Sequence, residues 1–575
     1  MVQNSRLGIV SGLFAIATLL GCSGEVTTDA TAVETKSVEA GEPIAKDNPA
    51  TERVSIDEPR LRQRIETLAS DDFLGRAPAT EGGAKTRAFL IEEMKALGLE
   101  PPVQNDDGTM GYEQPVPLVE TTVLPGRSEL LIDGQSYAYG TETVFWTKRA
   151  QENVSFDSSE VVFVGYGIVA PEYDWNDYEG LDVKGKTVLF LVNDPGFATQ
   201  DPEVFNGNAM TYYGRWTYKF EEAARQGAAA ALIIHQTEPA AYGWGVVQGS
   251  WAGPQIDLLR PDNGASRVAL EGWLHEDKAT ELFAQAGYDF ANVTTSAATQ
   301  GFQPIALGVS ASGSLTNTIR RSASANVAGL MKGSEAPDEY VLYVAHWDHL
   351  GSSAIGRDSI ANGAVDNATG TAGILSIAEA IAAMPEAPRR SIIFLAVTAE
   401  EAGLLGSAYF AEKPFVDLGK VVGGINIDGV LPLPPTKNLV VTGYGASELE
   451  GILEKAADAR GMYISPDPQP EKGYFYRSDH ISIAKKGVPM LYADLGPDLV
   501  EGGTDAAVSI EADYRTRRYH KPADEYEPEW DTRGIVTLLE VAQEVGLEIA
   551  NSDAWPNWYE GNEFRAIRDA QRTGL

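Results

Sequence analysis

The second half of this 575-residue chain alternates short apolar runs with helical patterns of apolar residues. The apolar runs are continuous rather than alternating in polarity, which is typical of strands buried on both faces of a sheet. They are "YVLYVAH" (340–346), "SIIFLAV" (391–397), "KVVGGINID" (420–428) and "VPMLYAD" (488–494). Helical spacing is found, for example, in Ile374, Ile377 and Ile381. This alternation predicts an α/β fold with a mainly parallel, mixed sheet sandwiched between helices.

The length of the chain and a change in its residue composition predict more than one domain. A chain of 575 residues exceeds what one hydrophobic core usually serves. Residues 151–309 hold short apolar strands such as "GKTVLFLVND", are rich in Gly, Trp and Tyr, and show no catalytic spacing of histidines. We therefore expect a domain built from residues 54–150 and 310–575, interrupted by a β-rich α+β insert at 151–309.

The first 53 residues predict export and anchoring rather than a folded domain. One Arg in "MVQNSR" precedes "LGIVSGLFAIATLL", an apolar stretch that is short for a membrane span and typical of a signal peptide. The following "LLGC" resembles the lipobox of bacterial lipoproteins, which implies cleavage before Cys22 and lipid attachment to its thiol. The alternative is an ordinary signal peptide with an incidental cysteine. Because Cys22 is the only cysteine, we favour a signal peptide at 1–22 and a lipid anchor in the bacterial cell envelope. Residues 23–53, poor in large apolar residues, then form a solvated tether.

Charge and cysteine content exclude two classes of function. The formal net charge of -37 argues against nucleic acid as a partner, because its phosphates would be repelled. A single cysteine allows no intrachain disulfide, and it excludes a structural zinc site built from several thiolates. Any metal must therefore be bound by nitrogen and oxygen atoms.

Unusual polar residues follow the strands of the predicted sheet, at the end where open α/β sheets bind ligands. Taken singly, each has an ordinary explanation, such as a helix N-cap for Asp366 or a hydrogen-bonded core histidine for His346. Together, two histidines and three carboxylates form a ligand set that suits zinc, with manganese or cobalt less favoured. The set is His346 in "HWDHLG", Asp366 in "NGAVDNATG", one of the adjacent Glu400 and Glu401 in "TAEEAG", Asp428 in "NID" and His520 in "RYHKPADE".

The adjacent Glu400 and Glu401 need a cation close to both. Like charges that leave a buried strand together raise the free energy of the fold unless a positive charge lies between them. Because neighbouring residues that leave a strand point in different directions, the two side chains are expected to have different tasks. One can bind a metal, and the other can take a proton from a water molecule.

Taken in order, these motifs resemble those of the co-catalytic zinc exopeptidases, family twenty-eight of the metallopeptidases. The resemblance rests on "AHWDHLG", "GAVDNATG", "TAEEAGLLGS", "NID" and "YHKPADE", and it covers most of 54–125 and 320–550. This family includes secreted bacterial aminopeptidases, vacuolar aminopeptidase Y and glutamate carboxypeptidase II. The resemblance implies the zinc exopeptidase fold, two zinc ions per chain, and a protease-associated domain at the place of the insert.

Carried onto this sequence, the resemblance implies ligands for two metal ions. They are His346 and Asp428 for one ion, Glu401 and His520 for the other, and Asp366 as the bridge between them. His349 lies too close to His346 to be assigned separately, and we expect it to form a hydrogen bond rather than to coordinate.

The resemblance also implies roles for residues that are not ligands. Glu400 is expected to be the general base, Tyr519 to hydrogen-bond the oxyanion, and Asp348 to accept a hydrogen bond from a ligand histidine. The stretch "RSDH" places Arg477 and His480 near the substrate pocket. Ordinary packing of Tyr519 and a helix N-cap within "RSDH" are the alternatives.

The sequence therefore predicts an exopeptidase that hydrolyses peptide bonds with a water molecule held between two zinc ions. An aminopeptidase that releases N-terminal residues is the leading interpretation. A carboxypeptidase of the glutamate carboxypeptidase type stays open, because it needs cations for the terminal carboxylate and Arg477, Arg515, Arg517 and Arg518 can supply them. A non-catalytic receptor-like relative is less favoured, because every matched ligand and the base are present. A single-zinc glutaminyl cyclase is less favoured because of the inserted domain and the full bridging set.

Overall fold

The computed structural model describes residues 54–352 and 359–573 of the chain, and these belong to one compact unit. The predicted signal peptide, Cys22 and the tether at 23–53 lie outside the described residues. Within the described ranges, no helix combines the length and the apolar character needed to cross a membrane.

A mixed, largely parallel sheet lies at the centre of the region that carries the predicted metal ligands. In spatial order its strands are β21 (Tyr463–Pro466), β20 (Asn438–Val441), β22 (Met490–Leu495), β19 (Val421–Asn426), β15 (Ala336–His346), β18 (Arg390–Val397) and β14 (Ile305–Met331). The four strands from β22 to β18 are those predicted from the sequence, and they run parallel to their neighbours within this group. β20 and β14 flank the group and are antiparallel to it. The prediction of a mainly parallel, mixed sheet is confirmed.

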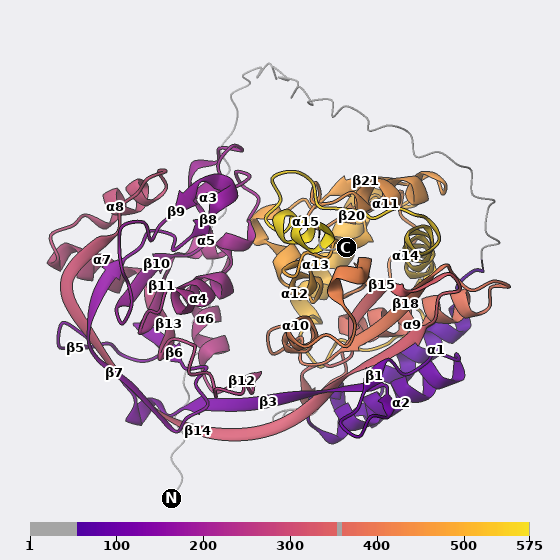
Figure 1. Cartoon of the computed structure of the whole chain (residues 1–575), viewed down its shortest axis with the longest axis horizontal. Helices are drawn as coiled ribbons and strands as arrows, with labels where there is room; N and C mark the ends of the chain where they lie inside the picture. Colours follow the sequence, from indigo (N-terminus) through magenta and orange to yellow (C-terminus); the bar gives the residue numbers. More distant parts are fainter. Residues whose placement is uncertain (1–53, 353–358, 574–575) are drawn as a thin grey trace, which may run out of the picture. The chain divides into compact units, whose positions relative to one another are not determined.

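Helices cover both faces of this sheet (Figure 1). They are α1 (Glu58–Leu68), α2 (Glu81–Ala96), α9 (Thr369–Ala382), α10 (Leu405–Glu412), α11 (Leu449–Asp458), α12 (His480–Ala484), α13 (Gly503–Arg517), α14 (Arg533–Asn551) and α15 (Arg565–Thr573). Successive residues of β15 point to opposite faces. Tyr343 packs in one hydrophobic core with α1, α9 and α14, and Leu342 packs in another with α10 and α12. The sheet is therefore a buried central layer, as its continuous apolar strands predict.

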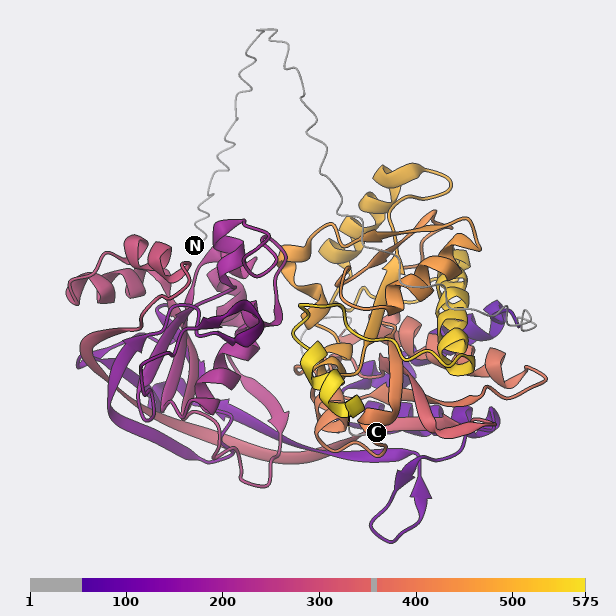
Figure 2. The same cartoon turned by 45° about the horizontal axis from the view of Figure 1, so that its top comes forward.

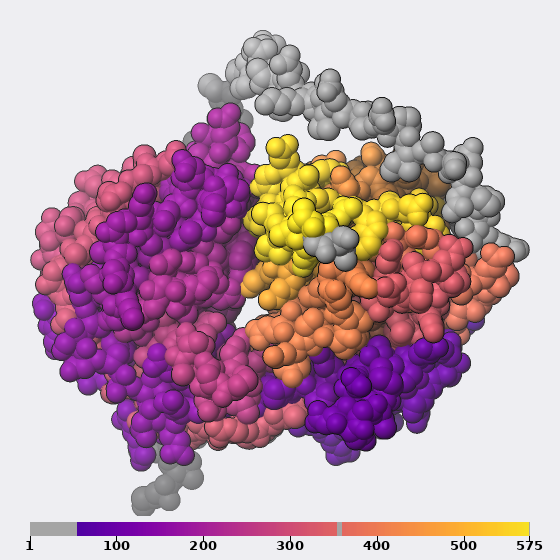
Figure 3. Space-filling model, in the orientation of Figure 1, coloured from indigo at the N-terminus to yellow at the C-terminus, as the bar shows by residue number. Residues whose placement is uncertain are grey.

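The two N-terminal helices belong to the same body as the sheet. Asp57 caps α1 by accepting a hydrogen bond from the backbone N–H of Arg60 at 3.0 Å. Gly98, with φ of 73°, follows the end of α2 in the left-handed conformation that suits glycine. Figure 3 shows this N-terminal segment, in indigo, packed beneath the coral and orange segments. Residues of α1, α2 and α9 share one hydrophobic core.

Gly546, on α14, is a position where an added methyl group is expected to destabilise the fold. A Cβ atom there would lie 1.9 Å from the hydroxyl oxygen of Tyr343, which donates a hydrogen bond to Ala542 O at 2.9 Å. Overpacking costs about 1–3 kcal/mol. With so severe an overlap, we expect this cost to exceed the roughly 1 kcal/mol by which Ala stabilises a helix relative to Gly. We expect Gly546→Ala to lower the free energy of unfolding, measured by urea denaturation.

Gly451→Ala on α11 is the matched control, because a Cβ atom added there meets no atom within 4 Å. This change is expected to raise the free energy of unfolding by up to about 1 kcal/mol. A stabilised Gly546→Ala protein would contradict the packing of α14 on the sheet.

A second region of the chain has its own hydrophobic core, formed by residues between Val123 and Leu315. Its strands are β4 (Glu129–Ile132), β5 (Gln135–Ser136), β6 (Thr143–Trp146), β7 (Asn153–Phe163), β10 (Thr187–Leu191), β11 (Ala230–His235), β12 (Pro254–Leu258) and β13 (Leu270–His275). Its helices are α3 (Pro195–Thr199), α4 (Trp216–Arg225), α5 (Thr237–Ala240), α6 (Trp244–Trp251), α7 (Glu276–Gln285) and α8 (Phe290–Ala297). The core starts upstream of the predicted boundary at 151. The boundaries and the protease-associated identity of this region remain predictions.

The central strands of this second region, β7, β10, β11 and β13, are parallel. Helices connect them, as α4 does between β10 and β11. The expected α+β arrangement is thus only partly observed, because parallel strands joined through helices follow an α/β pattern. The antiparallel strand β6 closes one edge.

Two long strands connect the two regions, as Figures 1 and 2 show. β14 pairs with β18 through residues 327–331 and with β7 through residues within 305–316. β3 (Glu113–Val123) runs antiparallel beside it. Short paired strands are β1 (Val103–Gln104) with β2 (Met110–Gly111), β8 (Val169–Ala170) with β9 (Trp175–Asn176), and β16 (Gly351–Ser352) with β17 (Ile360–Ala361).

Candidate metal centre

The predicted ligands lie beyond the carboxyl ends of three neighbouring parallel strands. His346, the last residue of β15, is level with Val397, the last residue of β18. Val344 of β15 is level with Asn426, at the end of β19. The loops that leave these strands therefore start side by side, at the edge where open α/β sheets bind ligands.

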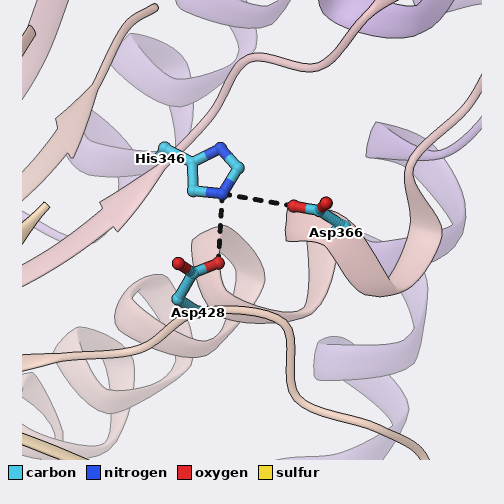
Figure 4. Close-up of side chains that lie close together, drawn as sticks. All are labelled: His346, Asp366 and Asp428. Atoms are coloured by element: carbon cyan, nitrogen blue, oxygen red, sulfur yellow. Dashed lines mark hydrogen bonds and ion pairs between the residues drawn. The ribbon is translucent and has the colours of Figure 1, made fainter. Parts of the chain in front are cut away.

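One group of possible metal ligands consists of His346, Asp366 and Asp428. The Nε2 atom of His346 lies 3.1 Å from Oδ1 of Asp428 and 3.3 Å from Oδ1 of Asp366. Figure 4 shows the three side chains pointing toward one another from three separate segments. These segments are the end of β15, the stretch before α9 and the loop after β19.

A second group of possible metal ligands, which consists of His349, Asp366 and Glu401, shares Asp366 with the first. The Oδ2 atom of Asp366 lies 3.2 Å from Nε2 of His520, and the same nitrogen lies 3.2 Å from Oε2 of Glu401. His349 also belongs to this side, since its Nδ1 atom lies 2.6 Å from Oε1 of Glu401. The two oxygens of Asp366 thus face different histidines, His346 and His520, which is the arrangement that a bridging ligand needs.

The tautomer of His346 follows from its surroundings. Its Nδ1 atom lies 3.1 Å from the backbone carbonyl oxygen of Asp348, and because a carbonyl only accepts, Nδ1 carries a hydrogen. Nε2, which faces Asp366 and Asp428, is left as the ligand nitrogen. The predicted hydrogen bond to Asp348 therefore goes to its backbone, because Oδ1 of its carboxylate is 4.0 Å from Nδ1.

The electrostatics of the cluster fit divalent cations. Burial and the charges of Glu401 and Asp428 raise the pKa of Glu400 well above its usual value, and burial with the charge of Asp366 does the same for Glu401. Burial lowers the pKa of His346, but the charges of Asp428 and Glu400 outweigh it and raise that pKa. Both effects express an excess of buried negative charge. Imidazole nitrogens among carboxylate oxygens form a ligand set that suits zinc.

The carboxylate of Asp348 holds the turn that presents the paired glutamates. Its Oδ1 atom accepts a hydrogen bond from the backbone N–H of Glu400 at 3.1 Å. The turn closes when the N–H groups of Gly403 and Leu404 donate to the carbonyl oxygen of Glu400, at 2.8 and 2.9 Å. Both Glu400 and Glu401 are partly exposed.

Tyr519 and Arg477 lie at accessible positions. The ring of Tyr519 stacks on the imidazole of His520 with 3.9 Å between centroids, and the residue is 39% exposed. Arg477 is exposed, with its guanidinium 5.4 Å from the ring centroid of Tyr474. Both residues can meet a substrate, and their assigned roles stay predictions.

From the stretch "RSDH", the structure brings Ser478 to the centre. Its hydroxyl donates to Oδ2 of Asp428 at 2.5 Å and accepts from Nδ2 of Asn426 at 2.8 Å, so it orients the carboxylate. His480 is completely buried, so its ring does not reach the surface in this structure. The sequence pattern indicated only an N-cap for Ser478, and nothing in it pointed to the bond with Asp428.

Two further charged residues, Arg76 and Asp524, were not predicted from the sequence, and both lie buried beside the metal centre. Asp524 occurs within the motif "YHKPADE", which is the one signal that pointed to it. Arg76 ends a short 3-10 helix, η1 (Asp71–Arg76), far from the ligands in sequence. No spacing between motifs in the sequence connects Arg76 to the predicted ligands.

Comparison with known proteins identifies the segment that carries the centre. Residues 326–543 match the sequence model of peptidase family M28, and all five predicted ligands lie within this range. The resemblance to metallopeptidase family twenty-eight is confirmed for this segment. The stretch 54–125, to which the resemblance also extends, lies outside the matched residues.

Curated relatives are similar to this chain over part of their length. Aminopeptidase NAALADL1 of Mus musculus is 37% identical over 164 residues, which cover 27% of this chain and 20% of that protein. Probable glutamate carboxypeptidase VP8 of Zea mays is 37% identical over 107 residues, 18% of this chain and 14% of that protein. Among solved structures, the aminopeptidase from Aneurinibacillus sp. strain AM-1 has 18% identity and a TM-score of 0.47, over 87% of this chain and 96% of that chain.

Proposed function

We propose that this chain, whose residues 326–543 match peptidase family M28, is an exopeptidase with two zinc ions, acting as an aminopeptidase on peptide substrates. The observation that carries the proposal is the position of Asp366. One of its oxygens lies 3.3 Å from His346 and the other lies 3.2 Å from His520. A carboxylate between two groups of ligands is what a two-metal centre requires. The partial similarity to Aminopeptidase NAALADL1 supports the choice of an aminopeptidase.

The residues of the cluster divide between two zinc ions. His346 and Asp428 would hold one ion, Glu401 and His520 the other, and Asp366 both. When bound, zinc supplies Lewis-acid chemistry that polarises a peptide carbonyl and lowers the pKa of a coordinated water. His349, hydrogen-bonded to Glu401 at 2.6 Å, fixes the orientation of that carboxylate.

Glu400 moves the proton in this proposal. A carboxylate oxygen of Glu400 takes the proton of the attacking water and gives it to the amine nitrogen as the peptide C–N bond breaks. Burial raises the pKa of Glu400, which brings it closer to the range where a carboxyl group accepts and donates a proton at neutral pH. Asp348 keeps the backbone of Glu400 in place through its hydrogen bond at 3.1 Å.

Tyr519→Phe tests whether the phenol hydroxyl stabilises the oxyanion. Loss of one such donor typically lowers kcat about 10²–10³-fold, and we expect a fall of this size with little change in KM. Steady-state kinetics with a free-amino peptide substrate measures it. Tyr288→Phe is the control, because Tyr288 is also 39% exposed but lies in the second region. Equal kcat values for both variants would assign Tyr519 to packing.

Paired peptides decide between an aminopeptidase and a carboxypeptidase. A specific observation favours the carboxypeptidase, which needs a cation for the terminal carboxylate of its substrate. The exposed guanidinium of Arg477 has no carboxylate within 4 Å among the described residues. One peptide has a blocked amino end and the other a blocked carboxyl end. Cleavage only with a free amino end supports the proposal, and cleavage only with a free carboxyl end assigns the chain to the carboxypeptidases.

The proposal includes a lipid anchor at Cys22 that keeps the enzyme on the bacterial cell envelope. Its support is the lipobox-like "LLGC" and the lack of any other cysteine. Labelled fatty acid is expected in the wild-type chain and absent from Cys22→Ser, when both are expressed in a bacterium that processes lipoproteins. Equal labelling of the two proteins would remove the anchor from the proposal.

A further inference from the structure

Arg76 reaches the backbone of two segments that carry predicted ligands. Its Nε atom donates to the carbonyl oxygen of Trp347, the residue after His346, at 3.0 Å. Nη1 donates to the carbonyl oxygen of Asn362 at 2.5 Å, and Nη2 to that of Gly363 at 2.8 Å. One side chain therefore ties the end of β15 to the stretch that leads to the shared ligand.

Asp524 holds the same stretch from its amide side. Its Oδ1 atom accepts the N–H of Val365 at 3.0 Å, and its Oδ2 atom accepts the N–H of Asp366 at 3.1 Å. The hydroxyl of Tyr514 also donates to Oδ2, at 3.3 Å. The backbone before and at Asp366 is thus bound by a cation at its carbonyl groups and by an anion at its amide groups.

The chemistry of these contacts explains why charged residues are buried there. Arg76 is 1% exposed, and among the described residues all its hydrogen-bond acceptors are backbone carbonyls, with no carboxylate within 4 Å. A buried guanidinium has a large desolvation cost that carbonyl groups only partly offset. Arginine directs several N–H groups in fixed directions, which the single ammonium of lysine does not reproduce. The contacts serve geometry rather than charge pairing.

We infer that Arg76 and Asp524 are positioning residues that hold the backbone at His346 and Asp366 and thereby set the zinc affinity of the centre. This inference rests on the proposed two-metal function. It extends the site to the N-terminal segment, because Arg76 lies outside residues 326–543 that match the peptidase family. Side chains that orient metal ligands from outside typically contribute 10–100-fold to metal affinity.

Arg76→Lys in the full chain is the first test. The variant keeps a positive charge and loses the directed hydrogen bonds to Trp347 and Gly363. Competition with a chelator of known zinc affinity is expected to show about 10–100-fold weaker zinc binding, with two ions per chain still bound at saturating zinc. Peptide cleavage is expected to recover as zinc is raised.

Arg390→Lys is the matched control for a purely structural effect. Arg390 is also 1% exposed and donates to the backbone carbonyls of Ile549 at 2.6 Å and Ala554 at 3.0 Å, and in addition to Oε2 of Glu339 at 2.6 Å. It begins β18, at the end of the strand opposite the metal centre. We expect Arg390→Lys to lower the thermal midpoint of unfolding as Arg76→Lys does, and to leave zinc affinity unchanged.

Asp524→Asn is the second variant, and it tests the inference about zinc affinity even if Arg76→Lys fails to fold. An amide nitrogen cannot accept the N–H of Val365 or Asp366, so one of these bonds is lost and zinc binding is expected to weaken. Zinc affinities equal to wild type in the folded variants, or an equal loss in Arg390→Lys, would overturn the inference. A wild-type chain that binds fewer than two zinc ions would instead overturn the proposed function.

Discussion

Glu400→Gln is expected to keep both zinc ions and to lose nearly all turnover. Glutamine has the size of glutamate and keeps the backbone N–H that donates to Asp348 at 3.1 Å, so the turn should persist. Its amide does not take a proton from water, and general-base catalysis is typically worth 10²–10⁴-fold. We expect kcat to fall by about this factor, with KM nearly unchanged. Elemental analysis and steady-state kinetics on the same preparation measure both quantities.

Glu386→Gln is the control for the charge change, because Glu386 is exposed in the loop between α9 and β18. It is expected to match wild type in zinc content and in kcat. Loss of zinc in Glu400→Gln would make Glu400 a ligand, and turnover equal to wild type would remove it from the base role.

Asp366→Asn is expected to lower the zinc content below two ions per chain and to abolish turnover. The two oxygens of Asp366 face His346 and His520 at 3.3 and 3.2 Å. An asparagine offers one neutral oxygen in place of two charged ones, so it cannot bridge two ions. The zinc content after dialysis, measured beside kcat, reports the effect.

Asp338→Asn controls for the loss of one aspartate charge. Asp338 lies near the start of β15, the side chain is 68% exposed and it pairs with Lys420 at 2.5 Å. Two zinc ions and wild-type turnover are expected for this variant. Two tightly bound zinc ions in Asp366→Asn would contradict the bridging role of Asp366.

The sheet around the centre could be predicted because its strands are buried on both faces. Continuous apolar runs mark such strands directly, and β18 differs from its predicted range only by starting at Arg390. The arrangement of the second region could not be predicted in the same way. Apolar runs alone do not show which neighbour a strand pairs with, and the parallel pairs β7–β10 and β10–β11 were not predicted. The periodicity of apolar residues also does not show which hydrophobic core a short strand such as β6 belongs to.

The metal ligands could be proposed because each follows a strand or lies in a recognisable motif. The structure brings His346 within 3.3 Å of Asp366 and 3.1 Å of Asp428, although the three residues are far apart in sequence. The residues that hold this cluster were harder to foresee. Arg76 acts through backbone carbonyls, which carry no residue-type signature. Ser478 acts through a single hydroxyl in a segment that also suits a helix cap.

Zinc titration of the metal-free full chain is the most direct test of the two-metal centre. The chain is stripped with a chelator, and zinc binding and peptide cleavage are followed as zinc is returned. The structure predicts two zinc ions per chain at saturation and cleavage that is absent without zinc and restored with it. Full cleavage by the metal-free chain, or saturation at one ion, would contradict a centre bridged by Asp366.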